Sequence, residues 1–374
     1  MRALGKEGIK VTIGESTRLA TALFSRYCRH PIVYPSPLFQ SGHFIEFLRN
    51  ELIHRPHRML LPMEDETMGL IARHHREFSR LTYLPVVPFE TFEFARRKDN
   101  ILKLAQQRGI PTPRTWYIDH VSDVDTLKNT LSYPVVIKPT TGAGANGVRY
   151  PENARELIRH YQEVHRYFPH PMIQEYIPRE GPGYGASFLV DERGEIKASF
   201  VHKRLREYPI TGGASTLRES TRYDTILAMG EDLLKAIGWF GVAMVEFKID
   251  LRDGTPKLME LNPRFWGSLN LAVAAGVNFP YLLYRMARGE KFEPVVRYEI
   301  GKKSRWLLPG DILHFIDHPR RSTLLPDFFY FRQADTVYDI CSLKDPLPVL
   351  ARLATPFTFL YDQDMKYRLR KRKL

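Results

Sequence analysis

VEFKID at residues 245–250 and LMELNPR at residues 258–264 are two short, mostly apolar stretches on either side of Asp253-Gly254. This arrangement is typical of a β-hairpin. Each stretch carries one carboxylate inside a core-like run, Glu246 in the first and Glu260 in the second. A bare carboxylate on a core strand is costly unless it is neutralised, and a hard divalent cation can neutralise it. The hairpin therefore predicts a metal site.

The second stretch adds Asn262 and Arg264 to the two carboxylates. An arginine beside them would neutralise a phosphoryl group that the metal also holds, which predicts a site for a magnesium nucleotide. Because side chains alternate between the two faces of a strand, Glu246 and Glu260 face each other only if the hairpin has an odd loop or a bulge. We therefore expect a three- or five-residue turn, or a bulge, around Asp253-Gly254. The alternative is an ordinary hairpin whose acidic side chains point into water.

The composition is that of a globular protein with a cytosolic location. The chain has 374 residues, enough for two or three domains, with 43% hydrophobic and 26% charged residues. It has neither an apolar stretch long enough to span a bilayer nor a signal peptide. The two cysteines, Cys28 and Cys341, fit neither a disulfide framework nor a zinc site.

The charge balance is strongly basic, at +13, and part of the excess is local. Residues 366–374 hold six basic residues and no acidic one, close to Phe357, Phe359 and Tyr361. Such a tail is solubilising or binds an anionic surface, here the inner membrane surface or a polyanion. Since no nucleic-acid-binding motif accompanies the charge, nucleic acid is not a predicted partner.

The N-terminal part alternates between strands and helices. A helix end at 2–8 stops at Gly8, and the pattern continues as strands at 11–14, 31–34 and 58–62 with a helix at 44–54. Such alternation predicts a parallel sheet with a crevice at its carboxyl edge. An α/β domain usually opens with a strand, so we expect its first strand to be missing. The acidic residues at 63–66 would lie at the crevice, or form the first turn of a helix.

The rest of the chain carries the nucleotide motifs. Lys138 ends a buried strand directly before the glycine-rich loop 140–147, where a lysine and backbone N–H groups would hold phosphates. The spacing is neither a Walker A motif nor a Rossmann fingerprint. QEYIP at 174–178 ends a strand whose free backbone edge could pair with adenine. A plain loop and an empty strand end are the alternatives. The predicted elements around these motifs are helices at 98–109, 152–167, 222–237 and 268–288, strands at 134–139 and 173–177, and a hairpin at 184–190 and 195–201.

In order and spacing these motifs resemble the ATP-grasp superfamily over about residues 1–290. The final motif, ELNPRFWG at 260–267, is most similar to the branch of carbamoyl-phosphate synthase large subunits and D-aspartate-ligase-like carboxylate–amine ligases. The resemblance implies an α/β and α+β fold. Residues 1–95 would form a parallel pre-ATP-grasp α/β domain, 96–290 an ATP-grasp domain of two α+β lobes with the small lobe at about 115–180, and 291–374 a C-terminal lobe with the basic tail.

The resemblance also implies roles for individual residues. Lys98 and Lys138 would hold the ATP phosphates, under a lid loop that includes Thr141, Gly142, Gly144 and Gly147. The backbone at Glu175, Tyr176 and Ile177 would read adenine. Glu180 would hold the ribose, although Gly181-Pro182-Gly183 departs from the usual spacing. Glu246, Glu260 and Asn262 would bind one or two Mg²⁺ or Mn²⁺ ions. Arg264 would stabilise the transferring phosphoryl group, with a structural ion pair as its alternative.

The implied reaction is an ADP-forming ligation of a carboxylate to an amine through an acyl phosphate. Residues 201–215 would lie near the reacting carboxylate, and their Lys203, Arg204 and Arg206 suit an anionic acid. We choose Arg204, with Arg264 and Lys138, as catalytic; His202 is either a base or structural. The alternatives are an enzyme of the carbamoyl-phosphate synthase or biotin carboxylase type that acts on bicarbonate, and a non-catalytic ATP-binding regulator. Dimers are common in the superfamily. The sequence names neither the acid nor the amine.

Overall fold

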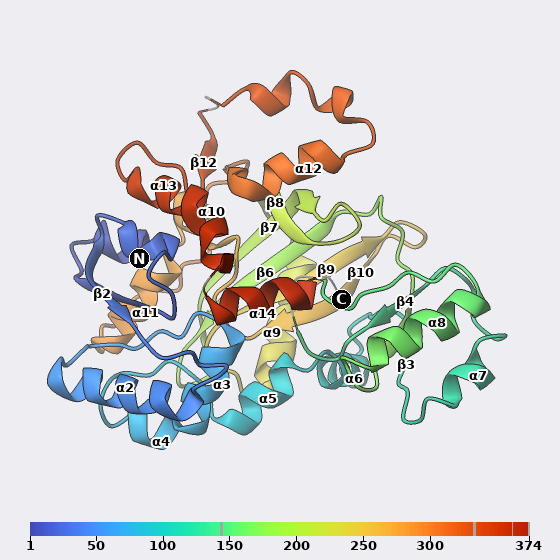
Figure 1. The fold of residues 1–374 in the computed structure, drawn as a ribbon, viewed down its shortest axis with the longest axis horizontal. Helices are drawn as coiled ribbons and strands as arrows, with labels where there is room; N and C mark the ends of the chain where they lie inside the picture. The colour runs from blue at the N-terminus through green and yellow to red at the C-terminus, as the bar shows by residue number, and fades with distance from the viewer. Residues whose placement is uncertain (143–144, 332–333, 361, 373–374) are drawn as a thin grey trace.

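The computed structural model describes residues 1–142, 145–331, 334–360 and 362–372. A seven-stranded sheet forms its centre (Figure 1). The order across the sheet is β10 (Thr255–Asn262), β9 (Gly241–Asp250), β6 (Gly183–Val190), β7 (Ile196–Tyr208), β8 (Ala214–Thr221), β11 (Lys303–Arg305) and β12 (Thr336–Tyr338). The neighbouring pairs from β10 to β11 are antiparallel, which confirms the two predicted hairpins.

Both faces of this sheet are covered. Side chains alternate along β9, so Val245 and Phe247 join one core while Val242 and Met244 join the other. The first core includes α6 (Lys98–Gln107) and α9 (Asp224–Ile237), whose bounds agree with the predicted helices. Glu246 lies on the same face of β9 as Val242 and Met244.

The helix predicted at 268–288 is in fact two helices, α10 (Leu269–Ala274) and α11 (Phe279–Ala287). Gly276 adopts a φ of +106° between them, a conformation that ends a right-handed helix and suits glycine. Asn278 then begins α11, where its side chain accepts a hydrogen bond from the backbone N–H of Tyr281 at 3.2 Å. The apolar periodicity runs through the break, which explains why the sequence predicts one helix.

A small lobe stands beside the central sheet. Its three strands lie in the order β3 (Thr115–Trp116), β5 (Met172–Glu175) and β4 (Val135–Lys138). The helix α8 (Ala154–His165) covers this sheet with Leu157, Tyr161 and Val164, three residues at helical spacing. A short helix, α7 (Asp123–Leu127), completes the lobe. Figure 1 shows this lobe on the right and the N-terminal domain on the left, with strands of the central sheet between them.

The N-terminal domain has one pair of parallel strands, β1 (Val11–Glu15) and β2 (Cys28–Val33). The strand predicted at 58–62 is wrong: it forms only one isolated bridge, between Met59 and Tyr83. Pro56 precedes this segment and Pro62 ends it, and both lack the N–H group that a longer ladder requires. The remaining elements are α1 (Arg2–Gly5), η1 (Thr21–Phe24), α2 (Ser41–His54), α3 (Asp65–Arg73), α4 (His75–Phe78) and α5 (Phe89–Arg96).

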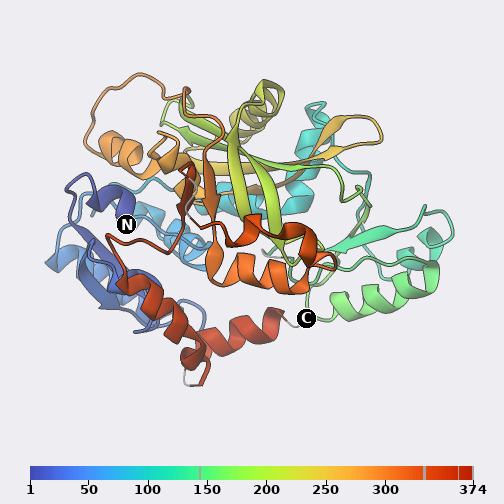
Figure 2. The same cartoon turned by 90° about the horizontal axis from the view of Figure 1, so that it is seen from above.

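The C-terminal segment is joined both to the central sheet and to the N-terminal domain. Its strands β11 and β12 extend the sheet beyond β8. Figure 2 shows its last helices along one edge of the molecule, beside the N-terminal domain. The elements are η2 (Leu307–Asp311), α12 (Ile312–Asp317), η3 (Arg321–Leu324), η4 (Asp327–Phe329), α13 (Leu347–Ala354), η5 (Thr355–Leu360) and α14 (Gln363–Arg372). Within the described residues, no helix has the length and apolar character needed to cross a membrane.

Candidate active site

The hairpin of β9 and β10 brings the two predicted metal-binding carboxylates together. Its turn, 251–254, has four residues, which in a regular ladder would place Glu246 and Glu260 on opposite faces. A bulge at Met259 inserts one extra residue, so Leu258 pairs with Phe247 and Glu260 then pairs with Glu246. The predicted bulge is confirmed, although it lies within β10 and not at Asp253-Gly254.

The same bulge helps to position Lys138. The Met259 carbonyl oxygen accepts a hydrogen bond from Lys138 Nζ at 3.3 Å. Lys138 is the last residue of β4 in the small lobe, and Met259 belongs to the central sheet. The bulge therefore connects the predicted phosphate-binding lysine to the strand that carries Glu260.

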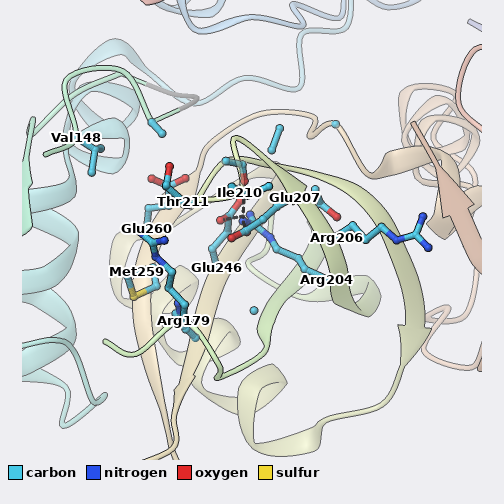
Figure 3. Close-up of a pocket in the computed structure, with 18 of the residues that line it drawn as sticks. Val148, Arg179, Arg204, Arg206, Glu207, Ile210, Thr211, Glu246, Met259 and Glu260 are labelled. Carbon is cyan, nitrogen blue, oxygen red and sulfur yellow. Dashed lines mark hydrogen bonds and ion pairs between the residues drawn. The ribbon is translucent and has the colours of Figure 1, made fainter. Parts of the chain in front are cut away.

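Basic side chains surround the two carboxylates. Lys98 Nζ lies 3.3 Å from Glu260 Oε2 and donates to the Gly142 carbonyl at 2.6 Å. The Arg204 guanidinium donates to Glu246, and Asn262 Nδ2 donates to Glu246 Oε1 at 3.1 Å. Figure 3 shows Arg204 reaching toward Glu246, whereas Arg206 points away from both carboxylates.

The charge states follow from burial and from these neighbours. Burial raises the pKa of Glu260, but Lys98 and Lys138 outweigh that effect and hold the pKa below its ordinary value. Burial raises the pKa of Glu246 by more than Arg204 lowers it, and it lowers the pKa of Lys138. With Lys98, three cationic side chains face two carboxyl groups. This excess of positive charge suits a ligand with several phosphates.

The donor set suits Mg²⁺ that arrives with a nucleotide. Among the described residues, no group of three or more His, Cys, Asp or Glu side chains could hold a metal by itself. Two carboxylates and the Asn262 amide are oxygen donors, and Mg²⁺ is usually held by one or two carboxylates plus substrate phosphates. In this arrangement Lys98 and Arg204 neutralise the carboxylates that a metal would bind.

A cavity of about 1270 Å³ contains this site and extends well beyond it. The small lobe contributes Thr141 and Gly142 from the loop after β4, and Glu175, Tyr176 and Ile177 from the end of β5. Glu180 also lines the cavity. Gly181 lies against β9, where an added Cβ would come within 1.9 Å of the Ile249 carbonyl oxygen. The unexpected Gly-Pro-Gly insertion therefore allows a close backbone approach.

One predicted glycine stands apart from this cavity lining. Gly147 is not among the lining residues; its φ is +72°, and an added Cβ would come within 2.8 Å of both Phe168 and Pro139. Gly147 thus serves the turn that closes the loop. Gly144 lies outside the described residues, so its predicted role stays a prediction.

Arg264 lines the cavity and also forms an ion pair. Its Nε lies 2.7 Å from Asp65 Oδ1, and its Nη1 donates to the Phe265 carbonyl at 2.9 Å. Asp65 is the first residue of α3, so the acidic stretch at 63–66 does begin a helix, as one of its two interpretations predicted. Both predicted roles of Arg264 are compatible with this position, because its side chain remains 17% exposed.

Two other side chains of β7 are directed elsewhere. Arg206 Nη1 lies 3.0 Å from Asp311 Oδ2, which ties it to η2. His202 is buried, its Nε2 lies 3.4 Å from Ser268 Oγ, and burial lowers its pKa well below the ordinary value. The His202 ring fills the space beside Gly185, where an added Cβ would come within 2.3 Å. A neutral, closely packed ring favours the structural role for His202.

Several cavity residues were missed by the sequence reasoning. Lys248 lies two positions after Glu246 on β9, and strand alternation alone could have indicated it. Arg218 of β8 is buried, pairs with Asp339 and donates to the Ser215 carbonyl at 2.7 Å. Trp306 and His318 come from the C-terminal segment, whose irregular pattern contains no signal for them.

Comparisons with known proteins agree with this geometry. Residues 168–307 match a family described as ATP-grasp in the biosynthetic pathway with Ter operon. Biotin carboxylase 1 of Bacillus subtilis (strain 168) is 30% identical over 183 residues, which is 45% of this chain and 40% of that protein. D-aspartate ligase of Enterococcus faecium (strain Aus0004) is 23% identical over 240 residues, 59% of this chain and 56% of that protein.

A solved structure shows the same fold. The biotin carboxylase domain of Hydrogenobacter thermophilus 2-oxoglutarate carboxylase, in complex with MgADP, ADP and bicarbonate, matches with a TM-score of 0.67 at 15% identity. The match covers 81% of this chain and 69% of that one. The predicted α/β and α+β class and the resemblance to ATP-grasp proteins are thus confirmed. This chain spans 40% and 56% of the lengths of the two curated relatives.

Proposed function

We propose that this chain is a member of the ATP-grasp superfamily and an ATP- and Mg²⁺-dependent ligase that activates a carboxylate for attack by an amine. One observation carries the proposal. Glu246 and Glu260 are paired across the bulge at Met259, and Lys98, Lys138 and Arg204 lie around them at the wall of one large cavity. Facing carboxylates surrounded by cations suit a metal–triphosphate complex.

The bound metal would neutralise charge on the phosphates and orient them for transfer. Glu246, Glu260 and Asn262 would hold it, and Lys98 and Lys138 would bind the phosphate oxygens as point charges. The ion pairs that now neutralise the carboxylates would then be exchanged for contacts with the ligand. Arg204, released from Glu246, would be available to the reacting carboxylate or its acyl phosphate.

In the reaction, an oxygen of the substrate carboxylate attacks the γ-phosphorus of ATP and ADP leaves. The amine nitrogen then attacks the acyl carbon, a C–N bond forms, inorganic phosphate leaves, and the nitrogen loses a proton. Water would hydrolyse the acyl phosphate, so closure of the loop that contains Thr141 and Gly142 over the phosphates would protect it.

The acid would bind on the side of the cavity away from the small lobe. Arg204 lies there beside the Gly212-Gly213 turn, and donates to the Gly213 carbonyl at 3.3 Å. Trp306 and His318 of the C-terminal segment line the same cavity. Most of this segment, His318 included, lies beyond the matched residues 168–307, so we infer that it contributes to substrate choice in this particular chain.

A second candidate substrate is bicarbonate, in a reaction that phosphorylates it to carboxyphosphate. It is favoured by the 30% identity to a biotin carboxylase and by the likeness to a biotin carboxylase domain in complex with bicarbonate. Both candidates use the same nucleotide site, so the identity of the acid has to be measured. A third candidate, a regulator that binds ATP without turnover, uses that site as well.

The first test is phosphate release from Mg·ATP in the presence of pooled amino acids, small carboxylic acids or bicarbonate. We expect release that requires one acid pool together with amines, and a loss of at least about 100-fold in Glu260→Gln. Asp253→Asn, at the exposed turn of the same hairpin, is the matched control and should keep full activity. Release with bicarbonate alone would support the second candidate. ATP binding without release in any pool would support the regulator.

A further inference from the structure

An exposed apolar surface lies on the C-terminal segment, far along the chain from the hairpin of the active site. Five side chains within fifteen positions are between 52% and 102% exposed: Leu343, Leu347, Leu350, Leu353 and Phe357. We call these five residues the leucine face. Leu347, Leu350 and Leu353 follow one another at three-residue spacing on α13, which places them on one side of the helix.

The other side of α13 is already packed. Pro348 and Ala351 are buried, and the helix lies against η1 of the N-terminal domain. The leucine face is therefore not needed for the folding of this segment. A cluster of large apolar side chains left exposed beside a polar surface marks an interaction site.

The charge around the leucine face is positive. Residues 341–374 contain eight basic and three acidic residues. Asp345 is buried against Arg2 and Ser25, Asp364 accepts a hydrogen bond from Ser36 at 2.5 Å, and Asp362 accepts one from the Met365 backbone N–H at 3.1 Å. All three acidic residues thus have partners within the protein, whereas Lys344 and Lys366 are exposed.

We propose that α13 and α14 dock this protein on an anionic lipid bilayer. The leucine face would enter the headgroup region, and the exposed Lys344 and Lys366 would lie near the lipid phosphates. Figure 2 shows α13 and α14 on the same edge of the molecule, joined through η5. A second copy of this chain fits less well, because each copy would bring its own excess of positive charge to the contact. A soluble polyanion would leave the exposed leucines unexplained.

The test is co-sedimentation of the full chain with vesicles of phosphatidylcholine alone or mixed with phosphatidylserine. We expect roughly tenfold more protein to pellet with the acidic vesicles at low salt, and this excess to disappear as salt is added. Leu350→Ser/Leu353→Ser should abolish most of the pelleting. The matched control is Leu251→Ser/Ile300→Ser, because both of these residues are also 55% exposed but lie outside the leucine face.

Thermal unfolding and light scattering accompany the test, so that folding and self-association are checked on every variant. Equal pelleting with both vesicle types, or full pelleting of the Leu350→Ser/Leu353→Ser variant, would overturn the proposal. So would a dimer that this double substitution converts to a monomer, because the leucine face would then bind a second copy. Binding to polyphosphate without any binding to vesicles would likewise assign the surface to a polyanion.

Discussion

Lys138 shows how one residue can depend on its ligand for its charge. Its ammonium group donates to the Met259 carbonyl, and the nearby Glu260 favours the charged form. Burial acts in the opposite direction and prevails, so the pKa of Lys138 is lower than that of an ordinary lysine. A bound triphosphate would favour the charged form of Lys138 by supplying opposite charge at short range.

We therefore predict that ATP affinity falls as pH rises through the range just below the ordinary lysine pKa. The sign follows because Lys138, when no ATP is bound, loses its proton at a lower pH than an exposed lysine does. A neutral amine then attracts phosphate only weakly. The measurement is the Kd of ATP between pH 7 and pH 10, by calorimetry. Lys138→Gln should bind ATP weakly with little pH dependence. Lys248→Gln, at another cavity lysine whose pKa is lowered by burial, should keep most of the ATP affinity and its pH dependence. An unchanged pH profile in Lys138→Gln would refute the assignment.

His202 leads to a prediction about stability. Burial, followed by Arg204 and Arg218, lowers its pKa well below the ordinary value of about 6.5. The unfolded chain then binds a proton that the folded chain does not, so stability is complete above pH 6.5 and is lost as pH falls below it. The slope contributed by this one group approaches about 1.4 kcal/mol per pH unit.

The check is urea unfolding at pH 7, 6 and 5. His202→Asn should be less stable at pH 7 because it removes a packed ring, but its stability should fall less steeply toward pH 5. His43→Asn, at an exposed histidine, should keep the slope of the unsubstituted protein. A steep acid loss that persists in His202→Asn would mean that other groups cause it.

At the scale of elements, the 178–183 connection between the small lobe and β6 depends on a glycine. An added Cβ at Gly181 would come within 1.9 Å of the Ile249 carbonyl oxygen, a backbone atom that cannot rotate away. Gly181→Ala should therefore push this connection away from β9 and displace the adjoining Glu180. We expect a loss of about 2 kcal/mol in stability and a weaker affinity for ATP.

Thermal unfolding and ATP titration measure the two effects of Gly181→Ala. Gly42→Ala is the control, since the space around Gly42 is open and its φ is negative, and it should unfold at the same temperature or slightly higher. Normal ATP affinity in a destabilised Gly181→Ala variant would separate the connection from the nucleotide site.

The β9–β10 hairpin shows what the sequence can and cannot predict. Alternation along strands is a local rule, so the facing of Glu246 and Glu260 and the need for a bulge could be predicted. The bulge lies at Met259, five residues after Gly254, because pairing near the turn remains regular from Asp250 to Leu258. The turn residues Asp253-Gly254 therefore did not indicate its position.

Contacts between distant segments explain most of what the sequence could not predict. Asp65 and Arg264 form an ion pair across 199 positions, and Arg218 meets Asp339 across 121. Local patterns carry no signal for such pairs. The resemblance identified Arg264 because its motif is contiguous, whereas the cavity residues of the C-terminal segment lie beyond the recognisable motifs.

At the scale of the whole molecule, the N-terminal residues are hydrogen-bonded to the C-terminal segment. Arg2 Nε donates to Asp345 Oδ2 at 2.7 Å, and its guanidinium also donates to the carbonyls of Asp339 and Ile340. Asp339 in turn holds Arg218 of the central sheet. The N-terminal domain, the central sheet and the segment before α13 are therefore connected through Asp339 and Asp345, so the leucine face and the cavity rest on one scaffold.

Asp345→Asn tests this connection. Burial raises the pKa of Asp345, but hydrogen bonds from Ser25, Arg2 and the Arg26 backbone outweigh burial and keep the pKa below its ordinary value. The carboxylate thus stabilises the fold at neutral pH, and this stabilisation is lost as pH falls through the acidic range below the ordinary aspartate pKa. Removing the charge should cost about 2 kcal/mol at pH 7.

Hydrogen exchange measured by mass spectrometry will locate that loss. We expect α13 and the backbone at 335–345 to exchange faster in Asp345→Asn, while α6, α9 and β9 keep their protection, because the hydrogen bonds of Asp345 go to Arg2, Ser25 and Arg26 and not to these elements. Asp335→Asn, at a side chain that is 70% exposed, should exchange like the unsubstituted protein. If exchange instead rises uniformly, the chain unfolds as one unit. If α13 keeps full protection, its contact with η1 is sufficient to hold the helix in place without the ion pair between Asp345 and Arg2.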